Sequence, residues 1–172
     1  MAPRDPQPVG FHLDVVTSSD IPVLERLWQL YRHDMSEFLG TQPGVDGYFR
    51  TKARDLNHYL SDPATELHLI RSDETPVGFV IAGGTATHTI SEFFVVRSVR
   101  HQGFGAAAAL TVLGSRPGPW VIAFQAQNLN AGRFWRRIVA RASGDRWDEE
   151  RRPIPGKPEV QPDVWLTFSV SG

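Results

Sequence analysis

The chain has 172 residues, of which 41% are hydrophobic and 22% charged, and its formal net charge at pH 7 is −1. This size and composition are typical of one globular domain with a sizeable core, and the near-zero charge argues against a surface built as a whole for nucleic acid or anionic membrane. The chain contains no cysteine, which excludes disulfides, thiol catalysis and thiolate metal sites.

The sequence divides into a short arm and one domain. The first nine residues, MAPRDPQPV, lack the apolar core of a signal peptide, and we expect residues 1–9 to be a disordered arm before a single domain at 10–172. No run approaches the ~20 apolar residues of a membrane span. We therefore expect a cytoplasmic protein without a membrane partner.

Hydrophobic periodicity and turn residues predict strands and helices along the whole chain. A cap cluster at 17–20 precedes the first helical stripe, and Ser72-Asp73-Glu74-Thr75 forms the turn of a hairpin. Strand–helix–strand crossovers around Gly103 predict an α/β (α+β) fold, with a mixed sheet and helices on both faces. The expected order is a strand at 11–16, helices at 24–38 and 48–60, strands at 66–71, 76–82 and 88–96, a helix at 103–113, a strand at 120–125, a helix at 131–142 and two last strands, the second at 164–170.

A glycine turn between a strand and a helix is the most informative stretch. The apolar run at 93–96 is followed by Gln102-Gly103-Phe104-Gly105, which opens an alanine-rich helix. The free N–H groups of a first helical turn and the helix dipole favour an anion, and glycine lets a ligand approach the backbone closely. We expect a pyrophosphate-bearing cofactor at this turn.

The spacing of residues around the glycine turn excludes a dinucleotide cofactor. Residues 103–108 match the dinucleotide-binding pattern G-x-G-x-x-A. That pattern needs the strand to run directly into the first glycine, and an acidic residue about 20 positions further on. Residues 97–102 intervene here, and residues 120–127 contain no carboxylate. The turn is therefore not that of a dinucleotide fold.

A second class matches more closely. Residues 100–105, RHQGFG, resemble motif A of the GNAT superfamily of N-acetyltransferases, which is written R/Q-x-x-G-x-G/A. Residues 128–135, NLNAGRFW, resemble its motif B, N-x-x-A-x-x-F/L-Y, one helix and one strand downstream as in that family. The resemblance implies a mostly antiparallel sheet of six to seven strands and an N-acetyltransferase that uses acetyl-CoA.

The same resemblance implies the residues around the cofactor. A solvated loop charge at Arg100 and a plain helix–sheet contact of the alanines are the alternatives. The implied cofactor-binding residues are, at the pyrophosphate, Arg100, His101, Gln102, Gly103, Phe104, Gly105 and Ala106, and, along the pantetheine arm, Phe93, Val95, Asn128, Ala131 and Trp135.

The catalytic groups are less sharply indicated. Acetyl transfer needs a deprotonated amine, a polarised thioester carbonyl and a proton for the leaving thiolate. Family members often take that proton from a Tyr at the position of Trp135, and an indole N–H is no useful acid, so water or one of the tyrosines at 31, 48 and 59 would serve. Glu92, a carboxylate inside an apolar strand, is the candidate base; a buried, hydrogen-bonded structural carboxylate is the alternative.

Three residues are candidates for binding the acceptor. Asp34 and Glu37 lie on the helix that walls the acceptor site in this family and could attract a cationic amine, with a solvated helix face as the alternative. Ser91 is the third, because similar polyamine acetyltransferases carry an acidic pair at the positions of Ser91 and Glu92. We expect direct acetylation of a primary amine of a small molecule, by a monomer or a homodimer, without metal or nucleic acid. A non-catalytic acyl-CoA-binding module is the alternative.

Overall fold

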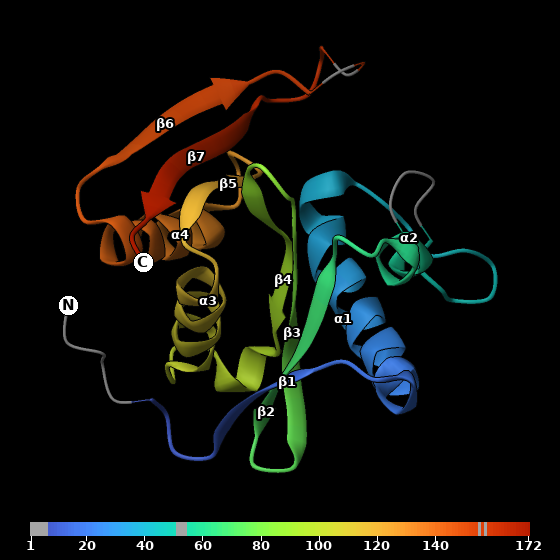
Figure 1. The fold of residues 1–172 in the computed structure, drawn as a ribbon. Coiled ribbons are helices and arrows are strands. Elements are labelled where there is room, and N and C mark those ends of the chain that lie inside the picture. The colour runs from blue at the N-terminus through green and yellow to red at the C-terminus, as the bar shows by residue number, and fades with distance from the viewer. Residues whose placement is uncertain (1–6, 51–54, 155, 157) are drawn as a thin grey trace. The chain divides into compact units, whose positions relative to one another are not determined.

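The computed structural model describes residues 7–50, 55–154, 156 and 158–172 (Figure 1). The order of elements confirms the one predicted from the sequence. The elements are β1 Phe11–Val15, η1 Ser18–Asp20, α1 Ile21–Leu39, α2 Leu56–Ser61, β2 Glu66–Ser72, β3 Thr75–Gly83, β4 His88–Val95, η2 Arg97–Val99, α3 Phe104–Ser115, β5 Gly118–Phe124, α4 Leu129–Ser143, β6 Trp147–Arg152 and β7 Asp163–Val170, where η marks a 3₁₀ turn.

The strands form a mixed, mostly antiparallel sheet of the predicted kind. Their order is β1-β2-β3-β4-β5-β7-β6 in a seven-stranded sheet. The β1–β2, β2–β3, β5–β7 and β6–β7 pairs are antiparallel. Strands β4 and β5 pair in parallel, at His88 with Trp120 and at Thr89 with Val121. The parallel pair is the one that a helix, α3, connects, as strand–helix–strand geometry requires.

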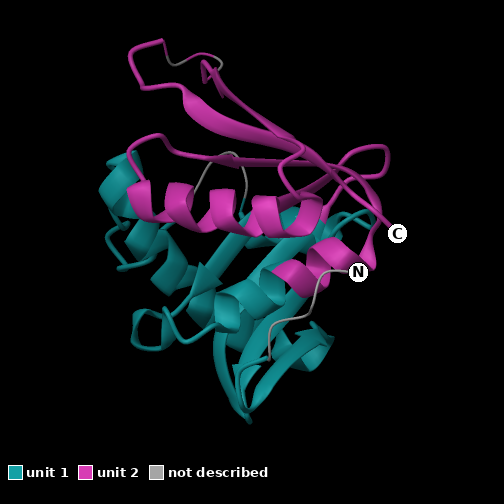
Figure 2. Ribbon diagram, turned by 90° about the vertical axis from the view of Figure 1, so that its left-hand side faces the viewer, with its two compact units in different colours: residues 1–82, 92–109 teal, residues 83–91, 110–172 magenta. Residues whose placement is uncertain are grey.

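The chain divides into two compact units, which we describe separately (Figure 2). Unit 1 comprises residues 1–82 and 92–109, and unit 2 comprises residues 83–91 and 110–172. The three boundaries fall at the end of β3, inside β4 and inside α3. The single domain expected over residues 10–172 stays a prediction, and most of the expected arm lies outside the described residues.

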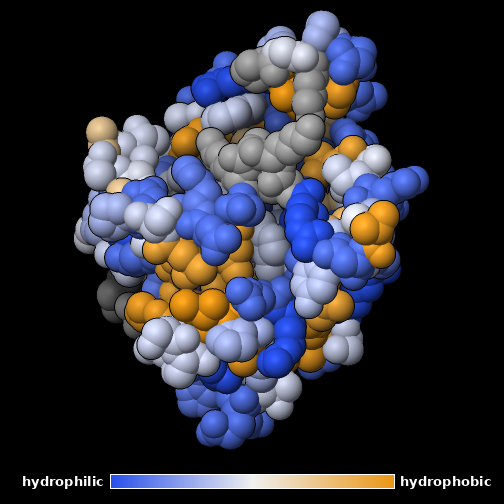
Figure 3. Space-filling model, turned by 90° about the vertical axis from the view of Figure 1, so that its right-hand side faces the viewer, coloured by the Kyte–Doolittle hydropathy of each residue, from blue (hydrophilic) through white to orange (hydrophobic). Residues whose placement is uncertain are grey.

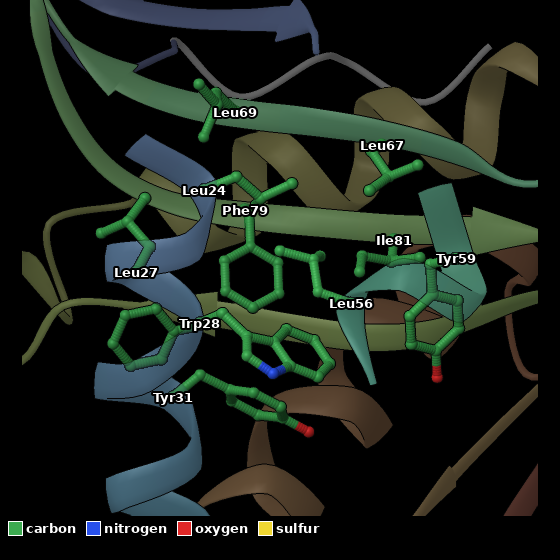
Figure 4. Close-up of a cluster of buried hydrophobic side chains, with 11 residues drawn as sticks. Leu24, Leu27, Trp28, Tyr31, Leu56, Tyr59, Leu67, Leu69, Phe79 and Ile81 are labelled. Carbon is green, nitrogen blue, oxygen red and sulfur yellow. The ribbon is translucent and has the colours of Figure 1, made fainter. Parts of the chain in front are cut away.

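Helix α1 closes the core of unit 1. Its apolar stripe packs on alternate residues of β2 and β3, and Figure 4 shows its side chains meeting those of the strands. The residues of opposite parity, Ile70 and Val80, are also fully buried, so the sheet of this unit is covered on both faces. The core side chains on the α1 side include Leu24, Leu27, Trp28, Tyr31, Leu56, Tyr59, Leu67, Leu69, Phe79, Ile81 and Phe94.

Local hydrogen bonds lie at both ends of α1, and those at its start cap the 3₁₀ turn η1 that leads into it. The Asp20 carboxylate accepts hydrogen bonds from the Thr17 backbone N–H at 3.0 Å and from the Thr17 hydroxyl at 2.7 Å. At the other end, Gly40 has a φ of +61°, and its N–H donates to the Ser36 carbonyl at 2.9 Å. The helix therefore begins and ends where short-range chemistry predicts.

The second predicted helix was too long. Only Leu56–Ser61 is helical; residues 48–50 are not, and residues 51–54 lie outside the described residues. The reason is a contact over long sequence separation: the Gln29 side chain of α1 accepts from the Phe49 N–H at 2.8 Å and donates to the Phe49 carbonyl at 3.3 Å. These two bonds take the place of helical ones. Asp55 then caps the shorter helix by accepting from the His58 N–H at 3.0 Å.

Unit 2 has its own core beneath α4. Strand β7 alternates, with Val164, Leu166 and Phe168 buried and Thr167 and Ser169 exposed. Helix α4 lies on the buried face, so within this unit the helix covers one side of the β5–β7–β6 sheet. The large, fully buried side chains of this unit are Leu113, Trp120, Ile122, Ile138, Val139 and Leu166.

The surface carries scattered apolar groups. On the face that Figure 3 shows, hydrophobic side chains reach the surface in separate areas among hydrophilic ones. Exposed large apolar residues of unit 1 include Leu30, Val45 and Tyr48. No helix in the described part of the chain is long and apolar enough to span a membrane.

Candidate functional site

The turn after β4 is built by two residues in left-handed conformation. His101 has a φ of +67° and Gly103 a φ of +93°, and α3 begins immediately afterwards at Phe104. Glycine takes this conformation without strain, whereas His101 does not. Phe104 is buried against Phe11, with ring centroids 6.3 Å apart, and this contact anchors the start of the helix.

The backbone of this turn presents free donors. Ala107 is the first helical residue that donates backward, to the Gly103 carbonyl at 2.9 Å, and Gln102 donates to the Val99 carbonyl at 3.4 Å. A helix start leaves such N–H groups for an anion. Within the described chain, no hydrogen bond is made by the N–H groups of His101, Gly103, Phe104, Gly105 and Ala106.

Two arginines and one carboxylate lie beside this turn. The Arg100 guanidinium donates from Nε to the Val95 carbonyl at 2.8 Å and from Nη2 to Asp34, and Arg97 donates to Asp34 at 2.9 and 3.1 Å. Partial burial acts to raise the pKa of Asp34, but the hydrogen bonds from Arg97 and Arg100 outweigh it and lower that pKa below its usual value. The α1 carboxylate thus orients the cations of the turn. Glu37 is exposed one turn further along α1.

Glu92 lies in a cage of two phenols. The Tyr59 hydroxyl donates to Glu92 Oε1 at 2.6 Å, and the Tyr31 hydroxyl donates to Oε2. Figure 4 shows Tyr31 on α1 and Tyr59 on α2, with both hydroxyls at the edge of the core cluster. Glu92 therefore points to the α1 side of β4, the side on which Phe94 is buried. Burial raises the pKa of Tyr31 well above 10, and the charge and hydrogen bond of Glu92 raise it further.

This arrangement fixes the orientation of the Glu92 carboxylate and limits which groups could protonate the leaving thiolate. Two of the lone pairs of Glu92 are used, and the remaining ones can accept a proton or a cationic donor. Tyr31 and Tyr59 already donate their protons to Glu92, so neither is free to protonate a leaving group. Tyr48 is 56% exposed and lies next to Arg50. Water and Tyr48 remain as possible acids.

The motif-B residues lie in unit 2. Asn128 accepts a hydrogen bond from the Ala131 N–H at 3.0 Å and so caps α4, which gives this part of the motif a local structural cause. Trp135 is 6% exposed and its ring lies 4.8 Å from that of Phe134. Ser91 is half-buried on the part of β4 that belongs to unit 2.

The structure thus gathers most candidate residues in unit 1. Among the described residues, no group of three or more His, Asp or Glu side chains is placed to hold a metal ion. The residues of unit 1 are Asp34, Glu37, Glu92, Phe93, Val95, Arg100, His101, Gln102, Gly103, Phe104, Gly105 and Ala106, and those of unit 2 are Ser91, Asn128, Ala131 and Trp135.

Two features of the site were missed from the sequence. Arg97 was not among the residues predicted to bind the cofactor, although it follows the apolar strand directly, three residues before Arg100. The pairing of the tyrosines with Glu92 was not named either. Its signal was a carboxylate in an apolar strand together with a tyrosine in the apolar stripe of a helix, because buried polar groups need partners.

Solved structures resemble this chain over nearly its full length. One is an acetyltransferase from Thermus thermophilus, with 18% identity, a TM-score of 0.66 and coverage of 96% of this chain and 100% of the other. Another is a ribosomal-protein-S18-alanine N-acetyltransferase from Escherichia coli, with 13% identity, a TM-score of 0.62 and coverage of 94% and 95%. A third is a GNAT family acetyltransferase from Elizabethkingia anophelis with acetyl-CoA bound, with 14% identity, a TM-score of 0.59 and coverage of 94% and 99%. The chain has the GNAT fold.

The GNAT fold confirms what the two motifs predicted about architecture. No protein-family model matches the sequence, and neither does any curated protein. The likeness is therefore one of structure. At these identities the likeness establishes the fold, and the chemistry has to be argued from the residues of the site.

Proposed function

We propose that this protein is an acetyl-CoA-dependent N-acetyltransferase that acetylates a primary amine of a small molecule by direct attack on the thioester. The observation that carries the proposal is the turn at 100–106, where free backbone N–H groups lie beside Arg97 and Arg100. Such a turn suits a pyrophosphate. The fold supports it, because one neighbour with this fold has acetyl-CoA bound.

The residues of the turn fit the cofactor in charge as well as in geometry. Asp34 offsets one of the two guanidinium charges, so the turn keeps a net positive charge for a diphosphate. Phe93 and Val95, proposed to pair with the pantetheine arm, follow the two residues of β4 that pair with β5. Asn128, Ala131 and Trp135 are proposed to contact the arm from α4.

The proposed chemistry uses Glu92 as the proton acceptor. Acetyl-CoA supplies an activated acetyl thioester. Glu92 takes a proton from the acceptor ammonium through a lone pair that the tyrosines leave unused, and the freed amine attacks the carbonyl carbon. The C–S bond then breaks, the attacking nitrogen gives up its second proton, and water or Tyr48 passes a proton on to the thiolate. Tyr31 and Tyr59 keep the carboxylate in one orientation throughout.

A cationic acceptor fits the charges around Glu92. Glu37 is exposed on α1, and the Glu92 carboxylate keeps lone pairs that the two phenol hydrogen bonds leave unused. Glu37 and Ser91 are proposed to bind the acceptor, whereas Asp34 is engaged by Arg97 and Arg100. Since the neighbours include an enzyme named for a ribosomal-protein alanine, the acceptor is not decided by the fold, and small amines and peptide N-termini both belong in the assay.

The test combines cofactor binding with turnover. At a concentration one hundred times its dissociation constant, acetyl-CoA should stabilise the protein by about 2.7 kcal/mol, which is about 5–10 °C in melting temperature for a chain of this size. Mass spectrometry should find acetylated product and free CoA with members of an amine panel.

Three variants separate the steps. Gly105→Leu should abolish both the shift in melting temperature and turnover, because it adds a bulky side chain to the turn that carries the free N–H groups. Glu92→Gln should keep the shift and lower kcat by about 10²–10⁴-fold. Gly114→Ala is the matched control in the same helix, since an added Cβ meets nothing within 4 Å there, and should change neither. If millimolar acetyl-CoA did not raise the melting temperature, the proposal would be disproved. A rise in melting temperature without turnover on any amine would indicate the acyl-CoA-binding module instead.

A further inference from the structure

Strand β6 forms an edge of the sheet. It pairs with β7 over its full length, from Trp147 opposite Phe168 to Arg152 opposite Asp163, and it is the last strand in the sheet order. In Figure 1 it lies along the outer side of β7. Within the described chain no strand pairs with its other side. An edge of this kind presents unpaired N–H and C=O groups to a further strand.

The charges of β6 alternate between its two faces. Glu149 and Arg151 lie opposite the buried residues Leu166 and Val164, so they are on the face that α4 covers. Asp148 and Arg152 are on the other face, together with Glu150.

Each face of β6 carries one charged side chain without an ion pair to a described residue, beside others that are paired. On the α4 face, Arg136 holds Glu149 through bonds of 2.7 and 2.8 Å. On the other face, Glu150 holds Arg152 through a bond of 2.6 Å from Nε, and the guanidinium of Arg152 stacks 4.6 Å from the centre of the Trp165 ring. The remaining two charges, Arg151 and Asp148, have no ion pair or hydrogen bond to any described residue.

Symmetry decides how two such edges can meet. A two-fold axis perpendicular to the sheet keeps each face on its own side, so only residues of equal parity lie opposite one another. In the register centred on Glu150, Asp148 lies opposite Arg152 of the second copy, and Arg151 lies opposite Glu149 of the second copy. Each unpaired charge, Asp148 or Arg151, then lies opposite a charge of opposite sign on the second copy.

The neighbouring registers are poorer. Centring the axis on Glu149 places Arg146 opposite Arg152 and Asp148 opposite Glu150, and both are like-charge pairs. Centring it on Arg151 places the unpaired Arg151 opposite its own copy and Asp148 opposite Ile154, so neither unpaired charge meets one of opposite sign. The favoured register has one like-charge contact, Glu150 against itself, and the Arg152 of each chain offsets that charge.

We propose that the protein forms a two-fold symmetric dimer in which the β6 strands of two copies pair antiparallel, centred on Glu150. The occupant of the edge is thus a second copy of this chain. Three acidic residues, Asp148-Glu149-Glu150, are followed along β6 by two basic ones, Arg151-Arg152. This distribution, with one unpaired charge on each face, is what selects a second copy.

Sedimentation velocity over a concentration series tests the dimer. Asp148→Arg and Arg152→Asp each place like charges opposite one another, and each should raise the dissociation constant by about tenfold or more, because symmetry repeats every changed pair twice. The double variant Asp148→Arg, Arg152→Asp should dimerise as the wild type does. A mixture of the two single variants should form heterodimers, because their charges complement each other.

Several results would overturn the proposal. A wild-type protein that stays monomeric at every attainable concentration contradicts the dimer. Single variants that dimerise as well as the wild type show that another surface is used. Loss of association that neither the double variant nor the mixture restores rules out the register. Far-UV circular dichroism of each variant checks that the fold is kept, and Asp148→Arg leaves the stack of Arg152 on Trp165 in place.

Discussion

Glu92 is held by two phenols from helices that lie far from it in sequence. Its carboxylate is part-buried, and each hydrogen bond to a charged group contributes about 1.5–3 kcal/mol. The carboxylate in turn gives the buried hydroxyls of Tyr31 and Tyr59 an acceptor. A single cluster therefore serves the core of unit 1 and places the proposed base. Removing one member should affect stability and not only turnover.

Replacing Tyr31 by phenylalanine should lower the free energy of unfolding near neutral pH by about 1–3 kcal/mol, because one oxygen of Glu92 loses its donor. The pKa of Tyr31 is raised in the folded protein, so its hydroxyl contributes fully to stability below the unfolded value of about 10 and loses that contribution as the pH rises further. The gap between wild type and variant should therefore narrow above pH ~10.

Urea unfolding at a series of pH values measures both effects. Tyr48→Phe is the matched control, because Tyr48 is exposed and its hydroxyl makes no hydrogen bond to a described residue; stability should stay unchanged. A Tyr31→Phe variant with wild-type stability at pH 7 would contradict the role given to the cluster.

The sequence predicted which charged residues matter better than it predicted their partners. Asp34 was expected to attract a cationic amine, and in the structure two cations of the chain itself, Arg97 and Arg100, bind it. The face of Glu92 also stayed open, because alternation along a strand gives two faces and does not say which one the first helix covers. Both answers depend on tertiary contacts.

The elements that the sequence predicted well are those whose position depends on residues close to them in the chain. The glycine turn needs only left-handed residues and a helix start, and both lie within residues 100–106. At the two ends of α1, Thr17 binds Asp20 and Gly40 binds Ser36, so the partners are no more than four residues apart. The predicted start of the second helix was wrong because Gln29, 20 residues away, binds the backbone of Phe49. No window of sequence around Phe49 contains that information.

Strand β3 contains a glycine that its neighbour requires. A Cβ at Gly78 would lie 2.2 Å from the carbonyl oxygen of Phe94 on β4, and that atom belongs to the backbone. Gly78→Ala should therefore push β3 and β4 apart and lower the free energy of unfolding by about 1–3 kcal/mol or more. Thermal unfolding followed by circular dichroism measures the change.

The control for this prediction is again Gly114→Ala. Its added methyl meets nothing within 4 Å in α3, so it should stabilise the protein by about 0.4–1 kcal/mol through the entropy of the unfolded chain. If the two substitutions had the same effect, close approach of the backbones at Gly78 would not matter.

At the scale of the whole molecule, the chain passes between the two units inside regular elements. The boundaries lie between Ala82 and Gly83 within β3, between Ser91 and Glu92 within β4, and between Ala109 and Leu110 within α3. A strand and a helix are cooperative structures, so neither unit can unfold without breaking hydrogen bonds that continue into the other. The two compact units are therefore expected to unfold together, with one free energy of unfolding.

Unfolding should accordingly show a single transition, and the tryptophans allow this to be tested unit by unit. Trp28 is the tryptophan of unit 1, and the other four, Trp120, Trp135, Trp147 and Trp165, belong to unit 2. In a Trp28→Phe variant, fluorescence therefore reports unit 2 alone, while far-UV circular dichroism reports both units. The two midpoints should coincide in urea, and saturating acetyl-CoA should raise them equally, because a ligand bound to a two-state protein stabilises all of it. Separate midpoints, or a ligand shift confined to one probe, would show that the units unfold independently despite sharing β4 and α3.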